Sequence, residues 1–346
     1  MRNGFARKNS LLIRWRAWLR ASAALAMWLG CAAGIAAENC VTANDMEPAT
    51  RAAVVSAGQR YFDLLAKGDA IALRQSAMPS LAADFSAIES LVKDNLPALA
   101  GSKATARPPF LLEAEGSAPM ARAEFFCGVF GRKGQTHDSA IFTLSNLPPG
   151  KYGVVILDVA SAKGLYMVSL ILQQIGGEWK LGGLYIKTGQ IAGRDSDWFA
   201  GRAREFQAKG QGHNAWLYYL EARWLISPLS FMSTAATDQL YDESQKAQPA
   251  DLPADDKTVN LSAGTVTYTL TALFPQAVGN DLDLVVRYKA ADISNTNQVY
   301  QNNVAVMKAL VTKYPEFRDA FAGVVARAVD ASGHDYGTLL AMKEIK

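Results

Sequence analysis

The sequence predicts an α+β protein, in which helices pack on a curved antiparallel sheet and are followed by a helical hairpin and a small β-β-α-β-β domain. Three observations predict this class. Apolar residues recur with helical spacing after residue 45, whereas from residue 108 to residue 188 apolar runs alternate with turn residues. Two stretches rich in Gly, Asp, Ser or Pro, at 189–197 and 248–257, then separate three units. Helices followed by a run of strands are typical of α+β domains.

The first unit, residues 45–190, begins with helices. Pro48 suits a first helical turn, and apolar residues from Val54 to Leu65 keep helical spacing until Lys67-Gly68-Asp69 ends the helix. Two shorter helices are expected at Ala70–Ala77 and Leu81–Leu91. One long antiparallel meander should follow, with a hairpin turn at Gly176-Gly177. Its strands are expected at 110–116, 122–130, 138–144, 153–161, 165–175 and 178–188.

The third unit, residues 257–346, has a β-β-α-β-β pattern. Strands are expected at Thr265–Leu270 and Leu282–Tyr288. Asn297–Lys313 is an amphipathic helix that Tyr314-Pro315 ends, and two more strands should follow at about 321–329 and 336–345. No family with known chemistry is assigned to this part.

Two motifs of the first unit resemble nuclear-transport-factor-2-like (cystatin-like cone) domains. Tyr61–Asp69 reads Tyr-Phe-Asp-Leu-Leu-Ala-Lys-Gly-Asp, which resembles the first helix of that family and its step into a second short helix. Gly177–Leu181, with its Gly-x-Trp-Lys run, resembles the closing strand pair. The resemblance implies a cone-like α+β domain over residues 45–190. It implies no particular chemistry, since the family holds enzymes that move protons in a conical pocket and also binding domains.

The second unit, residues 195–248, is helical and resembles a single tetratricopeptide-like hairpin. The residues that carry this resemblance are Phe199, Ala203, Phe206, Gly210, Ala215, Tyr219 and Ala222. One such repeat cannot bury its own apolar face, so the hairpin should pack on a neighbouring domain or on a partner. The alternative is an ordinary helical hairpin that links two domains.

Residues 1–37 predict a secretory signal peptide. Six basic residues and no acidic residue lie in the first twenty positions, and an uncharged, small and apolar run from Ala21 to Ala37 follows them. The protein is therefore expected in the periplasm or outside the cell. Two alternatives attach it to a membrane: retention of the segment as an anchor, or lipidation of Cys31, which follows Trp28-Leu29-Gly30.

The charge of the expected mature chain excludes a nucleic-acid footprint. The whole chain has a formal charge of +3. Removing the six basic residues of the signal leaves −3, with charges of both signs scattered along the chain. A weakly acidic chain of this kind lacks the basic patch that nucleic acid or anionic lipid requires.

Cys40 and Cys127 remain after removal of the signal, and an even pair in an exported chain predicts a disulfide. The bridge would tie the mature N-terminus to an apolar strand and contribute about 2–4 kcal/mol, mostly by restricting the unfolded chain. The alternative is a buried free Cys127 beside a disordered Cys40.

The sequence predicts no catalytic residue, metal ligand or cofactor. Its three histidines, His137, His213 and His334, are interpreted as hairpin-end, helix-cap and turn residues. A phosphate-binding loop, a nucleophile elbow and a zinc-binding HExxH motif are all missing from the sequence.

Six aromatic side chains of the first unit would converge between helices and sheet, where they either line a pocket or fill the core. They are Tyr61, Phe62, Phe85, Phe125, Tyr166 and Trp179. We therefore expect an exported, non-enzymatic binding or scaffolding protein of the cell envelope, with a small apolar ligand or an envelope protein as its partner. The alternative is an enzyme of the proton-transfer or lyase type, with a carboxylate deep in a conical pocket of residues 45–190.

Overall fold

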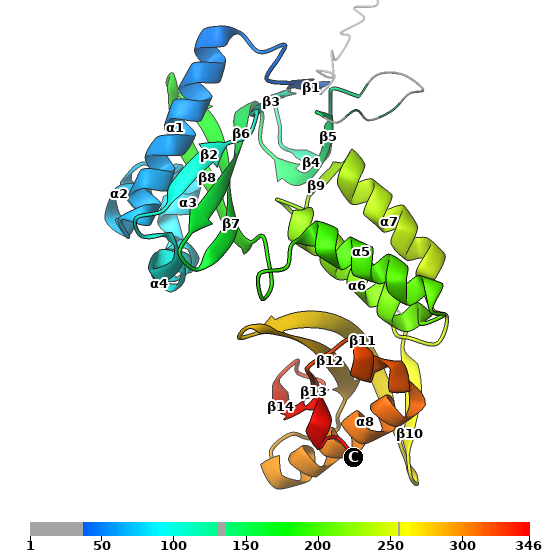
Figure 1. Cartoon of the computed structure of the whole chain (residues 1–346). Coiled ribbons are helices and arrows are strands. Elements are labelled where there is room, and N and C mark those ends of the chain that lie inside the picture. Colours follow the sequence, from blue (N-terminus) through cyan, green and yellow to red (C-terminus); the bar gives the residue numbers. More distant parts are fainter. Residues whose placement is uncertain (1–36, 130–133, 135, 137, 255–256) are drawn as a thin grey trace, which may run out of the picture. The chain divides into compact units, whose positions relative to one another are not determined.

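The computed structural model describes residues 37–346 except 130–133, 135, 137, 255 and 256 (Figure 1). The signal peptide predicted at residues 1–37, apart from Ala37, lies outside the described residues, as do Cys31 and His137. Residues 36–346 form one compact unit. Helices and mainly antiparallel sheets alternate along it, so the predicted α+β class is confirmed.

After one short strand, four helices follow: α1 (Pro48–Ala66), α2 (Ala70–Gln75), α3 (Pro79–Ala83) and α4 (Ser86–Leu99). The carboxylate of Glu47 accepts hydrogen bonds from the first amides of α1, and Pro48 occupies the first turn. Gly68, at φ +72°, ends the helix as the sequence predicted. The buried face of α1 holds Tyr61 and Phe62, and it packs against a sheet.

That sheet has six strands, all antiparallel, in the order β1-β3-β6-β7-β8, with β2 also paired to β6. The strands are β1 (Ala37–Val41), β2 (Lys103–Ala106), β3 (Phe110–Glu115), β6 (Gly150–Ser161), β7 (Gly164–Ile175) and β8 (Glu178–Thr188). The turn between β7 and β8 is the predicted Gly176-Gly177, with φ +59° and +86°.

The single long meander predicted for the first unit is wrong. The strands β4 (Met120–Cys127) and β5 (Ala140–Leu147) leave the main sheet and form a three-stranded sheet with β9 (Met232–Thr234). This second sheet packs on the main sheet and buries Phe125 and Phe142 there. The first unit therefore has three layers: helices, main sheet and small sheet (Figure 1).

The apolar run of β6 follows from this layering. Val155 and Leu157 belong to the core beneath the helices, whereas Val154 and Ile156 belong to the core beneath the small sheet. Because successive strand residues point to opposite faces, a strand between two cores is apolar at almost every position.

The disulfide predicted between Cys40 and Cys127 is confirmed. It joins the edge strand β1 to the end of β4, with the two Cα atoms 5.0 Å apart. It thus fastens one end of the main sheet to the small sheet, and it fits an oxidising environment.

Three helices follow where a two-helix hairpin was predicted: α5 (Ser196–Ala208), α6 (Gly212–Ile226) and α7 (Ala235–Ala247). Thr234 caps α7. The hairpin shares one hydrophobic cluster with the C-terminal sheet and its helix, to which Phe206, Tyr218 and Leu310 all belong. The expectation that the hairpin packs on a neighbouring part of the chain is confirmed.

The C-terminal part is a five-stranded sheet in sequence order that packs on the helix α8 (Thr296–Lys313). Its strands are β10 (Val259–Ala263), β11 (Val266–Val278), β12 (Asp281–Lys289), β13 (Gly323–Val329) and β14 (Asp335–Ala341). Only β12 and β13, which α8 connects, are parallel among these neighbours. The first strand, β10, adds one strand to the predicted pattern. Two 3₁₀ turns, Pro315–Asp319 and Met342–Glu344, complete the chain.

Candidate functional site

Two cavities adjoin where the helical hairpin meets the main sheet. They measure about 550 Å³ and 440 Å³, and Arg107, Asp158 and Ile226 line both. Arg107 comes from the segment between β2 and β3, Asp158 from β6, and Ile226 from the end of α6. We call these two cavities together the Arg107 groove.

Local structure fixes Arg107 at the junction. The two prolines that follow it, Pro108 and Pro109, keep its backbone extended. Its amide donates to the carbonyl of Ile156 at 2.8 Å. Its guanidinium donates to both oxygens of Asp158, at 2.9 Å from Nε and 2.6 Å from Nη2. A bidentate pair of this kind holds both side chains in one orientation.

The larger cavity is mainly apolar. Phe110, Ile156, Ile226 and Met232 supply its apolar surface. The hydroxyl of Ser139 donates its hydrogen bond to the carbonyl of Gly128, so it is not available as a donor to a ligand. Ligand pockets usually combine apolar walls of this kind with a few fixed polar groups.

The smaller cavity is also mainly apolar, but it carries charges of both signs. Lys103, Asp195 and Asp197 line it together with the Arg107–Asp158 pair. Asp195 also caps α5, because its carboxylate accepts from the amide of Trp198 at 3.0 Å. In the part of the chain that the structure describes, Nη1 of Arg107 has no hydrogen-bond partner, so one edge of the guanidinium can donate hydrogen bonds to an anionic ligand.

A half-buried lysine holds the end of α6 at this groove. Nζ of Lys187, on β8, donates to the carbonyl oxygens of Trp224 and Ser227, the latter at 2.9 Å, and lies over the Trp224 ring. It therefore closes the C-terminal end of α6, where carbonyls lack partners and a positive charge is favoured. Ser169 on β7 reaches the same end, because its hydroxyl donates to the carbonyl of Pro228 at 3.3 Å.

Glu221, one turn earlier on α6, is buried and interacts electrostatically with the half-buried Lys187. Burial raises the pKa of Glu221 to about 7, although the charge of Lys187 opposes this shift. Burial lowers the pKa of Lys187 to about 8, against the opposing effect of Glu221. Neither side chain lines the two cavities of the Arg107 groove, so we assign this pair to the attachment of α6 and not to the groove's chemistry.

The six aromatic side chains predicted to line a pocket do not lie together. Tyr61, Phe62, Phe85 and Trp179 are buried in the core between helices and main sheet. The hydroxyl of Tyr61 donates there to the carbonyls of Ser76 and Trp179.

The other two of the six are placed differently. Phe125 lies in the core on the opposite face of the main sheet, because its strand belongs to the small sheet. Tyr166 is half-buried at the edge of the first core and lines the smaller cavity of the Arg107 groove.

His213 makes a contact that its sequence context did not predict. It lies in the first turn of α6, where Nδ1 is 2.6 Å from a carboxylate oxygen of Glu316 and Nε2 is 2.9 Å from one of Asp251. Its ring packs on Tyr314. The imidazole thus connects α6, the segment after α7 and the turn after α8, and only its doubly protonated form donates to both carboxylates.

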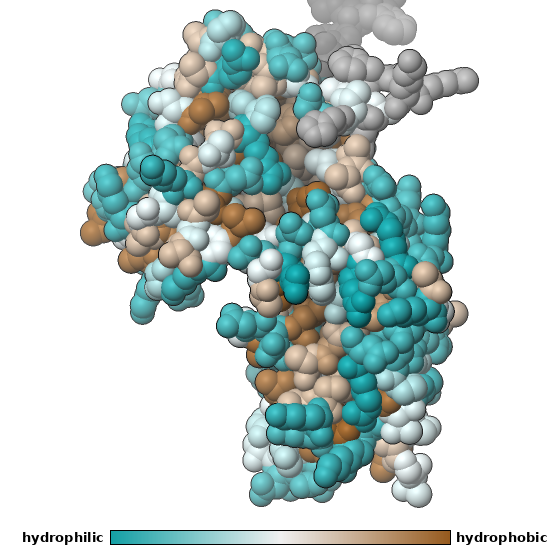
Figure 2. All heavy atoms as spheres, in the orientation of Figure 1, coloured by the Kyte–Doolittle hydropathy of each residue, from teal (hydrophilic) through white to brown (hydrophobic). Residues whose placement is uncertain are grey.

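Hydrophilic residues cover much of the face drawn in Figure 2, and apolar residues lie among them in small groups. Among the described residues, no group of three His, Cys, Asp or Glu side chains is placed to hold a metal ion. No helix in the described ranges is long and apolar enough to cross a bilayer.

Comparison of the chain with protein-family models, with curated proteins and with solved structures finds no match.

Proposed function

We propose that this chain is an exported, non-enzymatic binding protein of the cell envelope, and that the Arg107 groove holds its ligand. One observation carries the proposal: two adjoining cavities of about 550 Å³ and 440 Å³ share a bidentate Arg–Asp pair at their junction. Their sizes lie in the range of small-molecule sites, roughly 300–1,000 Å³. The signal-like N-terminus and the Cys40–Cys127 disulfide support export.

The groove favours an amphipathic ligand with an apolar body and an anionic group. Ile156, Ile226 and Met232 offer apolar contact in the larger cavity. The free edge of the Arg107 guanidinium offers hydrogen bonds to a carboxylate, sulfonate or phosphate. Asp158 holds that guanidinium in place but also neutralises part of its charge.

Anilinonaphthalene sulfonate is a suitable probe, since it combines apolar rings with one anionic group. Its fluorescence titration should give saturable binding to the purified chain. Ile226→Trp fills the junction and should weaken binding at least tenfold, and Arg107→Met removes the anionic contact and should weaken it about fivefold. Asp158→Asn releases the guanidinium and should leave binding as tight or tighter.

The matched control is Ile71→Trp, because Ile71 is an exposed apolar residue on α2 (74% exposed) away from the groove. This variant should bind the dye like the unmodified chain. Equal dye binding by Ile226→Trp and by Ile71→Trp would contradict the proposed site.

We propose binding ahead of the alternative, a proton-transfer enzyme. Such an enzyme needs a carboxyl group deep in the first unit with a raised pKa. Glu47, Glu113 and Glu178 have lowered pKa values instead, since hydrogen bonds from backbone amides or lysines favour their charged forms. Membrane attachment through residues 1–37 or Cys31 remains a separate proposal, which mass spectrometry of the native N-terminus tests.

A further inference from the structure

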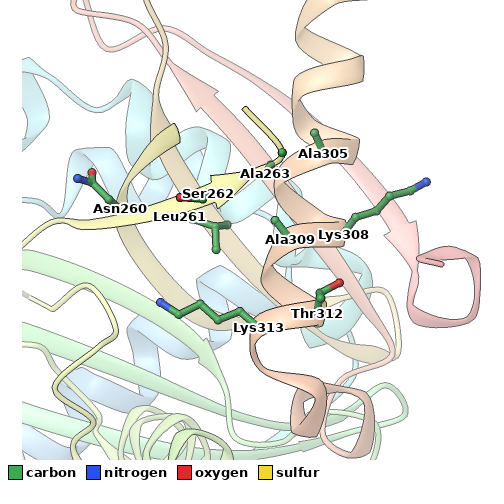
Figure 3. A pocket seen from close by; sticks show the side chains of 10 residues that line it. Asn260, Leu261, Ser262, Ala263, Ala305, Lys308, Ala309, Thr312 and Lys313 are labelled. Carbon is green, nitrogen blue, oxygen red and sulfur yellow. The ribbon is translucent and has the colours of Figure 1, made fainter. Parts of the chain in front are cut away.

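A second hollow, of about 680 Å³, lies between the strand β10 and the flank of α8 (Figure 3). It is independent of the Arg107 groove, because the two sites have no lining residue in common. Residues 260–264 form one wall, and Ala305, Lys308, Ala309, Thr312 and Lys313 form the other. The helix residues recur at three- and four-residue spacing, so they occupy one face of α8.

β10 is an edge strand of the C-terminal sheet. It pairs with β11 on one side, and no backbone hydrogen bond joins its other side to a described residue. The two-residue turn at Gly264, with φ +63°, makes Ala263 and Val266 a hydrogen-bonded pair. The alternation of such pairs leaves the N–H and C=O groups of Asn260 and Ser262 directed away from β11.

The strand β10 itself lacks three features that commonly block strand addition: a charge, a proline and a bulge. Its sequence, Val-Asn-Leu-Ser-Ala, contains no charged residue and no proline, and its register with β11 has no bulge. Beyond this edge, α8 presents the small side chains of Ala305 and Ala309, which lie between helix and strand in Figure 3. A further strand, about 4.8 Å from β10, would pass over these small side chains.

Two lysines flank this floor. Lys308 and Lys313 extend to opposite sides of it in Figure 3, and both are exposed. In the described part of the chain neither lysine forms an ion pair, and Lys313 contacts only the Tyr314 ring as a cation. A second copy of this chain would bring its own lysines against them, so like charges oppose pairing between copies. An acidic segment would meet complementary charge.

We propose that the edge of β10 and the flank of α8 form a strand-addition site for an extended, acidic peptide segment of a partner protein. The segment pairs with the outward groups of Asn260 and Ser262 and places its acidic side chains at Lys308 and Lys313. Main-chain hydrogen bonds supply affinity, and the lysines supply the preference for acidic sequences.

A blocked ten-residue peptide of alternating valine and glutamate is the probe, and its valine–lysine counterpart is the control peptide. Fluorescence anisotropy with the whole chain should show saturable binding of the acidic peptide, weakened by added salt, and binding of the basic peptide at least tenfold weaker. Hydrogen exchange should show new protection of the Asn260 and Ser262 amides in the complex.

Ser262→Pro removes an outward N–H that the fold itself does not use, so this variant should keep its far-ultraviolet spectrum and bind at least tenfold more weakly. The double variant Lys308→Glu with Lys313→Glu should no longer bind the acidic peptide and should bind the basic peptide instead. Lys163→Glu, in the turn between β6 and β7, is the matched control and should bind normally. Absence of binding, binding that survives both sets of changes, or formation of a dimer that Ser262→Pro abolishes would overturn the proposal.

Discussion

Glu221 is an acid whose charged form the folded protein disfavours. Its ordinary pKa of 4.5 rises to about 7 on burial, so between these values the folded chain keeps a proton that the unfolded chain has lost. The contribution of Glu221 to stability therefore falls as pH rises from about 4.5 to about 7. It amounts to at most about 3 kcal/mol, since one pKa unit corresponds to 1.36 kcal/mol.

The variant Glu221→Gln tests the predicted decrease in stability with rising pH. The difference in free energy of unfolding between variant and unmodified chain, measured with urea from pH 4 to 7.5, should change mainly between pH 4.5 and 7. Lys187, whose pKa is lowered from 10.5 to about 8, contributes the opposite slope between pH 8 and 10.5, so the measurement stops below that range. A constant difference across the acid range contradicts the assignment.

The disulfide gives a second prediction at this scale. Cys40→Ser with Cys127→Ser should lower the free energy of unfolding by about 2–4 kcal/mol, because the bridge closes a loop with a sequence separation of 87 residues in the unfolded chain. Urea unfolding measures the loss. Dithiothreitol should destabilise the unmodified chain to a similar extent and leave the double variant unchanged; a reductant effect on the variant contradicts this explanation.

Single residues also show which parts of the site the sequence could reveal. Tyr166 was predicted as a pocket residue because aromatic residues in an α+β core have a recognisable context. Arg107 and Asp158 were missed, because an ion pair across 51 positions leaves no local signal. His213 was interpreted as a cap residue from its neighbours, and its two carboxylate partners lie 38 and 103 positions away.

At the scale of elements, helix α1 approaches the main sheet closely at one glycine. A Cβ atom on Gly58 would lie 2.6 Å from Cγ1 of Val155 on β6. Gly58→Ala should therefore destabilise the protein by about 1–3 kcal/mol, even though alanine favours helices. Thermal and urea unfolding measure the change.

Gly201 in α5 is the matched control, because no atom lies within 4 Å of a Cβ added there. Gly201→Ala should stabilise the protein by about 0.5–1 kcal/mol through helix propensity alone. Val155→Ala added to Gly58→Ala should recover part of the loss. If both glycine variants stabilise the protein, the close approach of α1 to β6 is wrong.

Elements with strong local signals were predicted well, and those that depend on distant partners were not. α1, α8 and the hairpin of β7 and β8 carry clear periodicity and turn glycines, and their bounds differ little from the prediction. The short strands β1, β2 and β10 were missed. All three take their strand form from pairing with other segments.

The small sheet could not be predicted for a related reason. β5 has the alternation of a half-buried strand, which does not specify its neighbour. Its partner β9 comes from the segment between α6 and α7, far along the chain. The periodicity of the sequence thus predicts the strand but not the sheet to which it belongs.

At the scale of the molecule, the hairpin and the C-terminal part should unfold as one cooperative region. Tyr218 on α6 packs on Phe206 of α5 and on Phe321, and its hydroxyl donates to the carbonyl of Ala320 at 2.5 Å. Tyr218→Ala should cost about 3–5 kcal/mol, since it leaves a large cavity in this shared core.

Native-state hydrogen exchange measures how far that loss extends. Amides of both α5 and β12 should exchange faster in Tyr218→Ala, and amides of β6 should change much less. The control Leu157→Ala, in the core between helices and main sheet, should show the reverse pattern. Loss of protection confined to α5 and α6 contradicts a shared cooperative region.

The amino group of Lys187 limits where the chain can be truncated. Ser227 caps the carbonyl of Arg223 from within the helix segment, but the carbonyls of Trp224 and Ser227 are completed by a side chain from β8. A fragment starting at residue 195 would lose that cation and fray from Ile226 backwards. A stable fragment should therefore include β8 together with the hairpin. Alternatively, a glycine introduced after α6 could satisfy the last carbonyls of the helix.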